Sequence, residues 1–581
     1  MSVLQKLKDA KSLKELAILL SFKPSRVSYL LYKLDAEKKY SKFQIPKKSG
    51  GIREIQAPEP RLKALQKSLA DLLYECTLEI ESNGKKRPSL SHGFRKHHSI
   101  VTNARGHNGR RYVLNVDLEG FFPSINFGRV RGFFIADKSF SLNEKVATVV
   151  AQIACFENKL PQGSPCSPVI SNLIGHLLDV RLVRLAKAQK CSYSRYADDI
   201  TFSTNQKNFP PAMAVQDEKN PEKWIAGTTL SKTIENAWFK VNHAKTRLQS
   251  RTKRQSVTGV VVNKHVNVEA SYYKNVRAMC HSVFAKGEYH KPIVKSGDPS
   301  KGAEPSGPEM LKNIAPLEGM LAHIDYVKFG RDSPRSTVEN ASGKSRPPAT
   351  RRLYEKFLFF KHFVYLDKPL VLCEGKTDNV YLHAAIRQLK AHHSTFIGGS
   401  DQKPEMKIRF FKYSRTSNGI LGLNGGSGHL ANLIAYYSKN LKDYNFAPLL
   451  QPVIVLIDND DGAPPIFKTI KQNYKVTIDH SSADLFYRIC HNLYLVKTPE
   501  KATTYKSYIE ELFDDTVLQK KLNGKTFTTK KDYDKATQYG KEYFSKYIVR
   551  PNEASINFTK FSPLLDRIAS AVSHYGAAAD K

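Results

Sequence analysis

The chain has 581 residues, 41% of them hydrophobic and 25% charged, which is ordinary for a soluble globular protein of about two to four domains. Lysine and arginine outnumber acidic residues by 91 to 54, and a formal net charge of +37 favours nucleic acid as the partner over a merely solvated basic surface. Seven cysteines without any Cys-x-x-Cys pair argue against a zinc site or a disulfide framework. No apolar run has the length of a membrane span, so we expect a cytoplasmic protein.

The first predicted elements are helices followed by a hairpin. Apolar residues from Leu4 to Leu20 recur at helical spacing, and after a break at Phe22–Ser25 another helix begins over Val27–Leu34. The pair has the outline of a helix-turn-helix, but this shape is common as plain packing, so we do not expect it to read bases. Lys47–Ile55 contains a Gly-Gly turn with cations beside it, which is typical of a hairpin.

Three aspartates lie at the ends of predicted strands. The apolar strand Tyr112–Val116 ends in Asp117, and Asp198-Asp199 lies between aromatic and β-branched residues that favour a hairpin. Taken alone, this pair is more typical of an exposed polar turn. Adjacent carboxylates repel one another in a shielded site, and a divalent cation removes that conflict. With Asp117 beside them they would form a cage for two Mg²⁺ ions, which suits phosphoryl transfer.

A rigid loop and a long helix separate these carboxylates. Leu160–Pro168 is rich in proline and glycine, and a helical run follows over Val169–Leu185. Downstream, the polar stretch Asn205–Ala226 contains two adjacent prolines and is predicted to be an insertion or a surface loop. Thr229–Val241 is predicted as a helix and Gln255–Val262 as a strand.

These blocks, in this order and spacing, resemble the palm of a reverse transcriptase over roughly the first half of the chain. Two further stretches look like signature elements of bacterial retron reverse transcriptases. One is Asn103-Ala104-Arg105-Gly106-His107, just before the first catalytic strand, and the other is Val257-Thr258-Gly259, after Lys245. The resemblance implies that Asn103, His107, Val257, Thr258 and Gly259 belong to the parts that recognise the retron's own RNA.

The resemblance also implies a nucleotide site. In this family the finger hairpin closes on the incoming nucleotide, and Arg53 is the candidate for its triphosphate because a guanidinium fork matches phosphate oxygens. A solvated basic turn is the alternative. Phe122 would lie under the sugar and exclude a ribose 2′-hydroxyl, and Gln162 would lie beside the base and sugar. Ser91–Arg95 resembles a second finger motif, in which His92 is as well explained by a structural role.

A helical thumb is expected over Ser271–Leu366. Residues 295–308 and 330–348 are rich in Gly, Pro, Ser and charge and are predicted to be flexible. Between and after them, Met310–Phe329 and Arg351–Phe363 carry basic and aromatic residues at helical spacing. That mixture suits a nucleic-acid backbone, and an ordinary amphipathic helix explains it almost as well.

A second α/β pattern follows the thumb. The buried-strand run Pro369–Cys373 ends in Glu374, and a helix is predicted over Asn379–Lys390. A second buried run, Pro452–Ile457, ends in Asp458-Asn459-Asp460-Asp461-Gly462. Ligands usually bind at the carboxyl ends of parallel strands. Gly425–Gly428 opens another helix, either as a phosphate-facing start or as a plain turn.

Glu374 with Asp458-x-Asp460 resembles the TOPRIM domain of topoisomerases, primases and overcoming-lysogenization-defect-type nucleases. The resemblance implies that Asp458 and Asp460 hold Mg²⁺, while Glu374 binds metal or moves a proton at the scissile phosphate. Plain strand-end turns are the alternative. Asp461 and Glu510 are further nuclease candidates. Lys541–Lys546 could face a phosphate, but a solvated helix is the favoured interpretation.

The fold class expected is multidomain, α+β and α/β: a right-hand polymerase with fingers, palm and helical thumb, then a Rossmann-like TOPRIM domain with appended helices. The predicted domains are fingers and palm at 1–270, a thumb with flexible insertions at 271–366, the TOPRIM domain at 367–500 and its helical extension at 501–581.

The function expected from both resemblances is a retron RNA-directed DNA polymerase fused to a Mg²⁺-dependent TOPRIM nuclease, acting in antiphage defence. It would copy a cognate non-coding RNA from deoxynucleoside triphosphates, priming from a guanosine 2′-hydroxyl and leaving branched RNA-linked DNA. Two Mg²⁺ ions are expected at the polymerase site and one or two at the TOPRIM site. The other partners are the nuclease's nucleic-acid target and, as one alternative, a second copy of the chain.

Two rival interpretations differ in class. In one, the C-terminal domain is a non-catalytic module for nucleic-acid binding or oligomerisation. In the other, the protein is a mobile-element transcriptase like those of group II introns, although no recognisable maturase or zinc-containing endonuclease segment follows the thumb.

Overall fold

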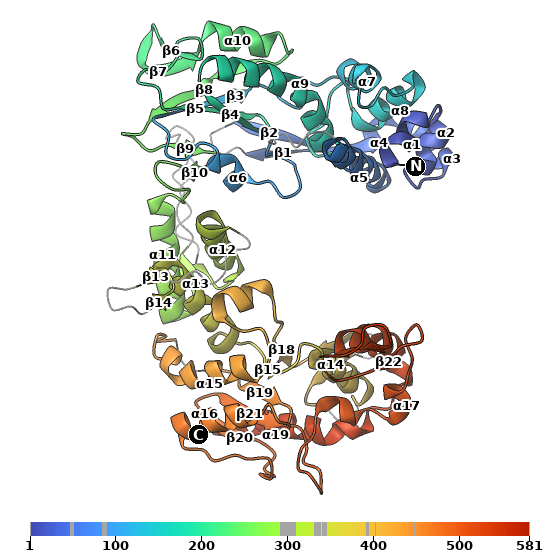
Figure 1. Ribbon diagram of the computed structural model, residues 1–581, viewed down its shortest axis with the longest axis vertical. Helices are drawn as coiled ribbons and strands as arrows, with labels where there is room; N and C mark the ends of the chain where they lie inside the picture. The colour runs from blue at the N-terminus through green and yellow to red at the C-terminus, as the bar shows by residue number, and fades with distance from the viewer. Residues whose placement is uncertain are drawn as a thin grey trace. The chain divides into compact units, whose positions relative to one another are not determined.

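The computed structural model describes residues 2–46, 51–83, 90–290, 310–330, 338–339, 345–390, 394–400, 403–446, 449–530 and 532–579. Lys47, Lys48 and Gly50 of the predicted finger turn lie outside these residues, as do 295–308 and most of 330–348. The described chain forms two compact units, one up to Tyr272 and one from Tyr273 onward, shown together in Figure 1 and described separately below.

The first unit is built around a four-stranded antiparallel sheet of order β4-β5-β3-β8. Its strands are β4 (Ser192–Tyr196), β5 (Asp199–Thr204), β3 (Tyr112–Leu118) and β8 (Val241–Ser250). Apolar side chains of β3 and β5, such as Leu114 and Phe202, are fully buried. The long helix α9 (Ser167–Ala188) packs against β4, and α10 (Thr228–Glu235) packs against α9 (Figure 1). Because these apolar side chains are buried, the ends of the strands are where polar side chains can gather into a site.

Helices and one hairpin complete the first unit. The hairpin is β1 (Tyr40–Pro46) with β2 (Ile52–Pro58), and the helix α5 (Pro60–Asn83) follows it. The N-terminal helices α1 (Val3–Asp9) and α2 (Leu13–Leu19) are separated at Ala10, and the Ser12 hydroxyl caps α2 by accepting from Glu15 N at 3.3 Å. The helices α7 (Phe127–Ala136) and α8 (Glu144–Ala154) pack against each other in the same core.

Two sequence predictions in this unit are corrected, for Thr229–Val241 and Gln255–Val262, and the predicted insertion or surface loop Asn205–Ala226 gains a hairpin. The predicted helix Thr229–Val241 ends as α10 at Glu235, because Trp238 takes a φ of +62° and the chain from Val241 enters the sheet. The predicted loop Asn205–Ala226 contains a hairpin of β6 (Ala214–Asp217) and β7 (Asn220–Ala226). The predicted strand Gln255–Val262 is itself a hairpin of β9 (Ser256–Val257) and β10 (Val260–Val261).

Helices predicted as the thumb belong to the second unit. They are α11 (Ala270–Lys286, from Tyr273 onward), α12 (Ala315–Phe329) and α13 (Ala349–Phe359), which continues into the π-helical turn η2 (Phe360–Val364). Phe284 of α11 packs its ring against Phe360 and Tyr444. Tyr444 follows the α/β helix α15 (Ser427–Leu441), so these helices share an aromatic core with the α/β part.

The second unit contains a five-stranded sheet of order β18-β15-β19-β21-β20. Its strands β15 (Leu370–Cys373), β18 (Arg409–Phe410), β19 (Val453–Ile457) and β21 (Leu493–Lys497) are parallel, and β20 (Tyr487–Cys490) is antiparallel. Every residue of β15, β19 and β21 is buried, as expected for a parallel sheet covered by helices. Those helices are α14 (Asp378–Gln388), α15 and α16 (Pro464–Tyr474).

Residues after 501 pack onto this sheet instead of forming a separate body. The last helix, α19 (Ser562–Ala579), contacts β21, and Phe513, Phe544 and Leu564 share one apolar core with Val371 of β15. None of the helices in the described part of the chain combines the length and hydropathy needed to cross a membrane.

Candidate functional site

Residues 82 positions apart meet at one end of the first sheet. In the antiparallel register, Asp117 at the end of β3 lies opposite Asp199 at the start of β5. Asp198 lies in the β4–β5 turn, and its carbonyl accepts a hydrogen bond from Leu118 N at 3.1 Å. The two carboxylate-bearing stretches are therefore held side by side by main-chain bonds.

The turn before Asp199 is tight. Tyr196 pairs with Asp199, leaving a two-residue loop of Ala197 and Asp198. Ala197 has a φ of +57°, the left-handed region that two-residue hairpin loops require at their first position and that an alanine adopts at a cost. This geometry projects the Asp198 carboxylate beyond the sheet.

Crowding shifts the proton affinity of these carboxylates. Desolvation, with a contribution from Asp117, raises the pKa of Asp198. The Asp199 side chain reaches solvent, yet protein surrounds it closely enough that desolvation, with Asp198 and Asp117 adding to it, raises its pKa to about 6. Lys245 Nζ lies 3.0 and 3.1 Å from the two carboxylate oxygens of Asp117, and Asn242 Nδ2 lies 3.2 Å from one of them.

A cavity of about 950 Å³ opens beside this end of the sheet. It is lined by two of the three aspartates, by all three predicted nucleotide-binding residues, and by two polar residues of β8: Asp117, Asp198, Arg53, Phe122, Gln162, Asn242 and Lys245. Asp199 is not among the lining residues. The Gln162 carbonyl accepts from Gln56 N at 2.8 Å, which ties the loop after α8 to the β1–β2 hairpin. The cavity therefore joins segments from across the unit.

The donors at this end of the sheet fit a divalent metal ion. Carboxylate oxygens are the ligands that Mg²⁺ prefers, and desolvation with neighbouring carboxylates raises the pKa of Asp198 and Asp199, a cost that a bound cation would reduce. The ammonium of Lys245 stands in for part of that charge. No group of three or more His, Cys, Asp or Glu side chains is arranged as a closed metal site anywhere in the described ranges.

Sequence reasoning did not assign Lys245 or Asn242 to the site. Both lie on β8, which pairs with β3 so that Asn242 is opposite Asp117. The only signal in the sequence is the polar run Asn242–Thr246 immediately after a predicted helix, and nothing in it reveals the pairing with Asp117.

Two of the predicted RNA-recognition residues, Asn103 and His107, pack against strands β4 and β5. Asn103 and His107 are fully buried: Ser194 Oγ donates to Asn103 Oδ1 at 2.6 Å, and the two His107 nitrogens lie 2.7 Å from Ser203 Oγ and Ser194 Oγ. Burial lowers the pKa of His107 to about 3, so its ring is neutral. Both side chains brace β4 and β5, and the prediction that they belong to the part that recognises RNA stays a prediction.

Val257, Thr258 and Gly259 form the β9–β10 turn. Val257 is buried, while Thr258 and Gly259 take φ values of +47° and +79°, the pattern of a type I′ turn. Thr258 Oγ1 donates to Ile100 O at 3.3 Å, which places this turn beside the helix that carries Asn103. The structure therefore brings the two predicted RNA-recognition segments together, with Gly259 exposed at the tip.

A second acidic group lies at the carboxyl end of the parallel sheet. Strands β15 and β19 are neighbours, so Glu374 and Asp458 emerge side by side, with Glu374 N donating to Leu456 O at 2.9 Å. Gly426 N donates to the Glu374 carbonyl at 3.0 Å, which brings the start of α15 to the same place. Asp460 Oδ1 accepts from Gly462 N at 2.8 Å.

Glu374 has two properties expected of a metal ligand: a raised pKa and a buried oxygen atom without a hydrogen-bond partner among the described residues. Desolvation, with Asp460 and Asp378 adding to it, raises its pKa to about 7. Its Oε2 atom is buried and has no hydrogen-bond partner within the described residues. Leaving a carboxylate oxygen buried and unsatisfied is costly, and a bound cation would remove that cost.

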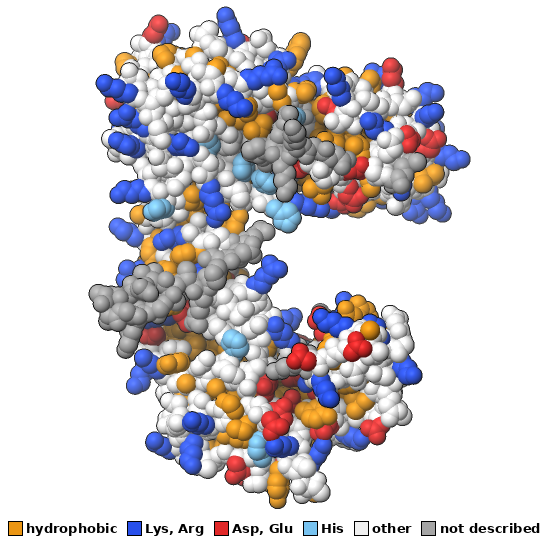
Figure 2. Space-filling model, in the orientation of Figure 1, with side chains coloured by type: hydrophobic (Ala, Val, Ile, Leu, Met, Phe, Trp, Pro, Cys, Tyr) orange, Lys and Arg blue, Asp and Glu red, His pale blue; other side chains and the backbone are white. Residues whose placement is uncertain are grey.

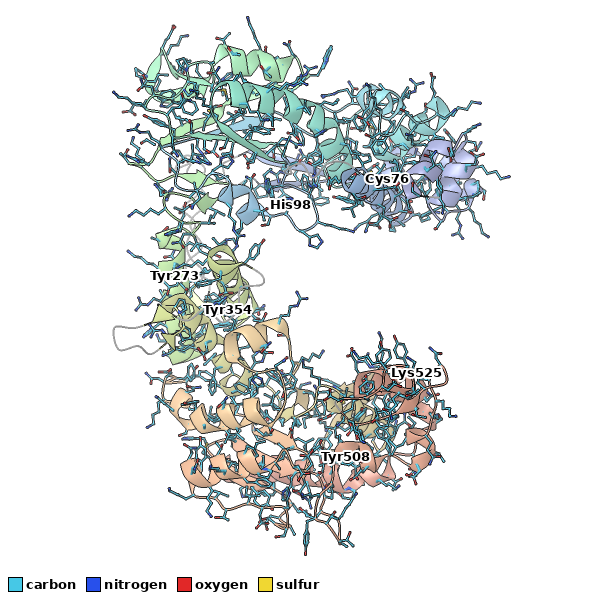
Figure 3. All side chains as sticks on the ribbon, in the orientation of Figure 1. Cys76, His98, Tyr273, Tyr354, Tyr508 and Lys525 are labelled. Carbon is cyan, nitrogen blue, oxygen red and sulfur yellow. The ribbon has the colours of Figure 1, made fainter. Side chains whose placement is uncertain are left out.

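The same centre contains groups that sequence reasoning missed or misjudged. Asp378 at the start of α14 is buried, and desolvation raises its pKa and that of Asp458. Glu510 is fully buried with its Oε2 2.9 Å from Lys541 Nζ, and it lies on the 3₁₀ turn η4 (Ile509–Leu512), which follows Tyr508 in Figure 3. The favoured prediction of a solvated helix over Lys541–Lys546 describes Lys546, which is exposed, but not Lys541, which is partly buried against Glu510. Asp378 lies only four residues after Glu374, so its position in the sequence pointed to this centre, whereas no feature of the sequence pointed to Lys541.

Asp461 is separate from this centre. Its side chain is 90% exposed and bonds Lys506 Nζ at 2.5 Å, so it points to solvent and not toward Glu374.

Lys and Arg side chains are spread widely over the face of the first unit shown in Figure 2.

Comparisons with known proteins concern mainly the first unit. The family model for reverse transcriptase (RNA-dependent DNA polymerase) matches residues 45–262. The retron Mx65 reverse transcriptase of Myxococcus xanthus is 35% identical over 260 residues, covering 42% of this chain and 55% of that protein. The retron Ec86 reverse transcriptase of Escherichia coli is 33% identical over 256 residues, covering 43% of this chain and 71% of that protein.

The solved structures that resemble the chain include a telomerase from Candida albicans in complex with a fragment of telomeric RNA. It is 9% identical, with a TM-score of 0.27, and the match covers 42% of this chain and 50% of that one. A likeness of this size carries no argument. The chain spans about half the length of the Mx65 enzyme, and the residues that the family model matches contain the first acidic site.

Proposed function

The chain belongs to the retron reverse transcriptases, and from this premise we propose that it copies a cognate non-coding RNA into branched, RNA-linked single-stranded DNA. The observation that carries the proposal is the single cavity in which Asp117 and Asp198 face Arg53, Phe122 and Gln162. Carboxylates for metal ions, a guanidinium for a triphosphate and an aromatic ring for the sugar are the parts that template-directed nucleotide addition needs.

Each lining residue has a proposed task. Two Mg²⁺ ions held by Asp117, Asp198 and Asp199 would lower the pKa of the priming hydroxyl and stabilise the leaving pyrophosphate. Arg53 pairs with phosphate oxygens of the incoming nucleotide, since it lies near enough to lower the pKa of Asp198. Phe122, held by ring contacts with Phe121 and Phe94, forms the floor under the sugar.

Competition between protons and metal gives a testable pH dependence. The pKa of Asp199 is about 6, against an ordinary value of 3.8. Below about pH 6 its carboxylate is protonated, so DNA synthesis at limiting Mg²⁺ should fall, and added Mg²⁺ should move the midpoint to lower pH.

Without metal, this group makes the folded state lose stability as pH rises through about 6, because the folded protein then gives up a proton that the unfolded chain has already lost. Mg²⁺ titrations of synthesis and of the melting temperature at several pH values check both.

The nucleic acid that copurifies with the protein tests the copying proposal. We expect one structured RNA joined through a guanosine 2′-oxygen to a DNA complementary to part of it. Debranching followed by sequencing reads both strands and the junction. Recovery of unjoined, heterogeneous RNA would contradict the proposal, and an RNA with intron boundaries would favour the mobile-element alternative.

For the second unit we propose a TOPRIM-type nuclease with Mg²⁺ at Glu374, Asp458 and Asp460, to which the structure adds Asp378 and Glu510 as neighbours. The supporting observation is the raised pKa of Glu374 together with its buried, unpartnered oxygen. When bound, Mg²⁺ would polarise the scissile phosphate and activate a water molecule. Lys541 balances the charge of Glu510.

The proposed biological role is antiphage defence, in which the RNA–DNA product holds the nuclease silent until infection disturbs it. The alternative for this unit is a non-catalytic module for nucleic-acid binding or oligomerisation. A module of that kind needs no carboxylate with a raised pKa and an oxygen atom that has no hydrogen-bond partner among the described residues, so Glu374 favours the nuclease.

A further inference from the structure

Behind the turn that carries Asp198 lies a fully buried guanidinium. We propose that Arg195 is a positioning residue, which fixes the Ala197-Asp198 loop so that the Asp198 carboxylate meets the metal ions at the correct angle. The proposal rests on the polymerase function proposed above. It concerns a group that does not line the cavity and that touches neither nucleotide nor metal.

Arg195 is held in one orientation by a buried carboxylate. Its Nε and Nη2 donate to Asp179 Oδ1 and Oδ2 at 2.6 and 2.8 Å, and both side chains are essentially inaccessible to solvent. Tyr193 OH donates to the same Asp179 Oδ1 at 2.6 Å. A bidentate pair fixes the plane of the guanidinium, which a single contact would not do.

The remaining nitrogen of Arg195 bonds the loop itself. Nη1 donates to the Ala197 carbonyl at 3.0 Å. Ala197 is the residue with a φ of +57°, a conformation that an alanine keeps only when its surroundings compensate for it. The bond from Arg195 supplies that compensation at the peptide that leads directly into Asp198.

Packing from a second segment closes the loop from the other side. Asn172 Nδ2 donates to Gly93 O at 2.7 Å, and a Cβ atom at Gly93 would lie 2.5 Å from Ala197 N. The main chain of Arg195 joins the same segment, since His92 N donates to Arg195 O at 2.8 Å. The loop is therefore clamped between the 91–95 segment and the guanidinium.

The surroundings of Arg195 accept only this side chain. A Cβ atom at Gly175 would lie 2.8 Å from Nη2, so α9 approaches the guanidinium as closely as a glycine permits. A lysine keeps the charge but carries its donors on one nitrogen, so it does not reproduce the planar fork that bonds Asp179 through Nε and Nη2 and the Ala197 carbonyl through Nη1. The geometry indicates that Arg195 positions the loop as well as neutralising the charge of Asp179.

The experiment compares Arg195→Lys and Gly175→Ala with wild type in the full chain. The matched control is Arg567→Lys, because Arg567 also forms a buried bidentate pair, with Glu500 at 3.1 and 2.5 Å, far along the chain from the polymerase residues. The measurements are kcat and KM for a deoxynucleotide, the Mg²⁺ concentration for half-maximal synthesis, and Mn²⁺ binding by electron paramagnetic resonance. The Mn²⁺ sites lost in Asp198→Asn define the sites of the polymerase cavity.

We expect both variants to lower kcat and to weaken Mg²⁺ and cavity Mn²⁺ binding by about 10-fold, with KM for the nucleotide nearly unchanged. Arg567→Lys should leave all these values at the wild-type level. The proposal fails if metal dependence stays at the wild-type value in a folded variant. It also fails if both variants unfold, since the pair would then act on stability alone. Absence of synthesis by the wild type, in contrast, would count against the proposed function.

Discussion

Replacing Asp198 and Asp199 together with asparagine will reduce DNA synthesis by at least about 10³-fold while leaving the fold intact. Asparagine has nearly the same shape as aspartate but carries no charge. The substitution therefore removes two charges that desolvation, with repulsion from Asp117, makes costly to ionise, along with the attraction for Mg²⁺. Since burial opposes the ionised forms, the variant should melt at the same temperature as wild type or slightly higher in the absence of metal.

Extension of the copurified RNA with labelled deoxynucleotides measures this prediction. Asp71→Asn is the matched control, because Asp71 is an exposed aspartate of the same unit whose partner is Lys67 on the surface of α5. It should synthesise DNA at the wild-type rate. Branched DNA persisting in the double variant would show that these carboxylates do not hold the catalytic ions.

Replacing Glu374 with alanine will remove Mg²⁺-dependent nucleic-acid cleavage, and host toxicity with it, by at least about 10²-fold without changing DNA synthesis. Glu374 lies at the meeting point of β15, β19 and the start of α15, where Asp458 and Asp460 also converge. Because the lost oxygen is buried and unsatisfied, the variant should not melt at a lower temperature.

Asp461→Asn provides the control for this second centre. It lies in the same loop as Asp458 and Asp460 but bonds Lys506 at the surface, so its removal should leave cleavage unchanged. Cleavage that survives Glu374→Ala would exclude the proposed centre. Toxicity that survives while cleavage is lost would mean that the second unit harms the host by another route, as a binding module would.

Local patterns in the sequence were sufficient wherever the chemistry depends on one strand end or one turn. Asp117 follows an apolar strand, Asp198 lies in a hairpin loop, and Glu374 and Asp458 each follow a buried strand. Strand periodicity and turn composition act over a few residues, so they are visible without any knowledge of the rest of the chain.

Local patterns were misleading where tertiary contacts override them. Helical spacing continues past Glu235 to Val241, yet pairing of β8 with β3 takes the end of that stretch into the sheet. The sequence leaves the contacts of Asn103 and His107 open, and in the structure both are fully buried and bond serines of β4 and β5. A polar side chain in a sequence does not reveal whether its partner is solvent, RNA or another strand.

By itself, the sequence determined that the protein has two groups of strand-end carboxylates and a strongly basic composition, because residue type and short-range spacing specify these. Only the tertiary structure decided that Lys245 and Asn242 meet Asp117, that Lys541 meets Glu510, and that Arg195 supports the loop of Asp198. Such contacts join residues far apart in the chain, and their formation depends on strand register and side-chain packing, which no local pattern encodes.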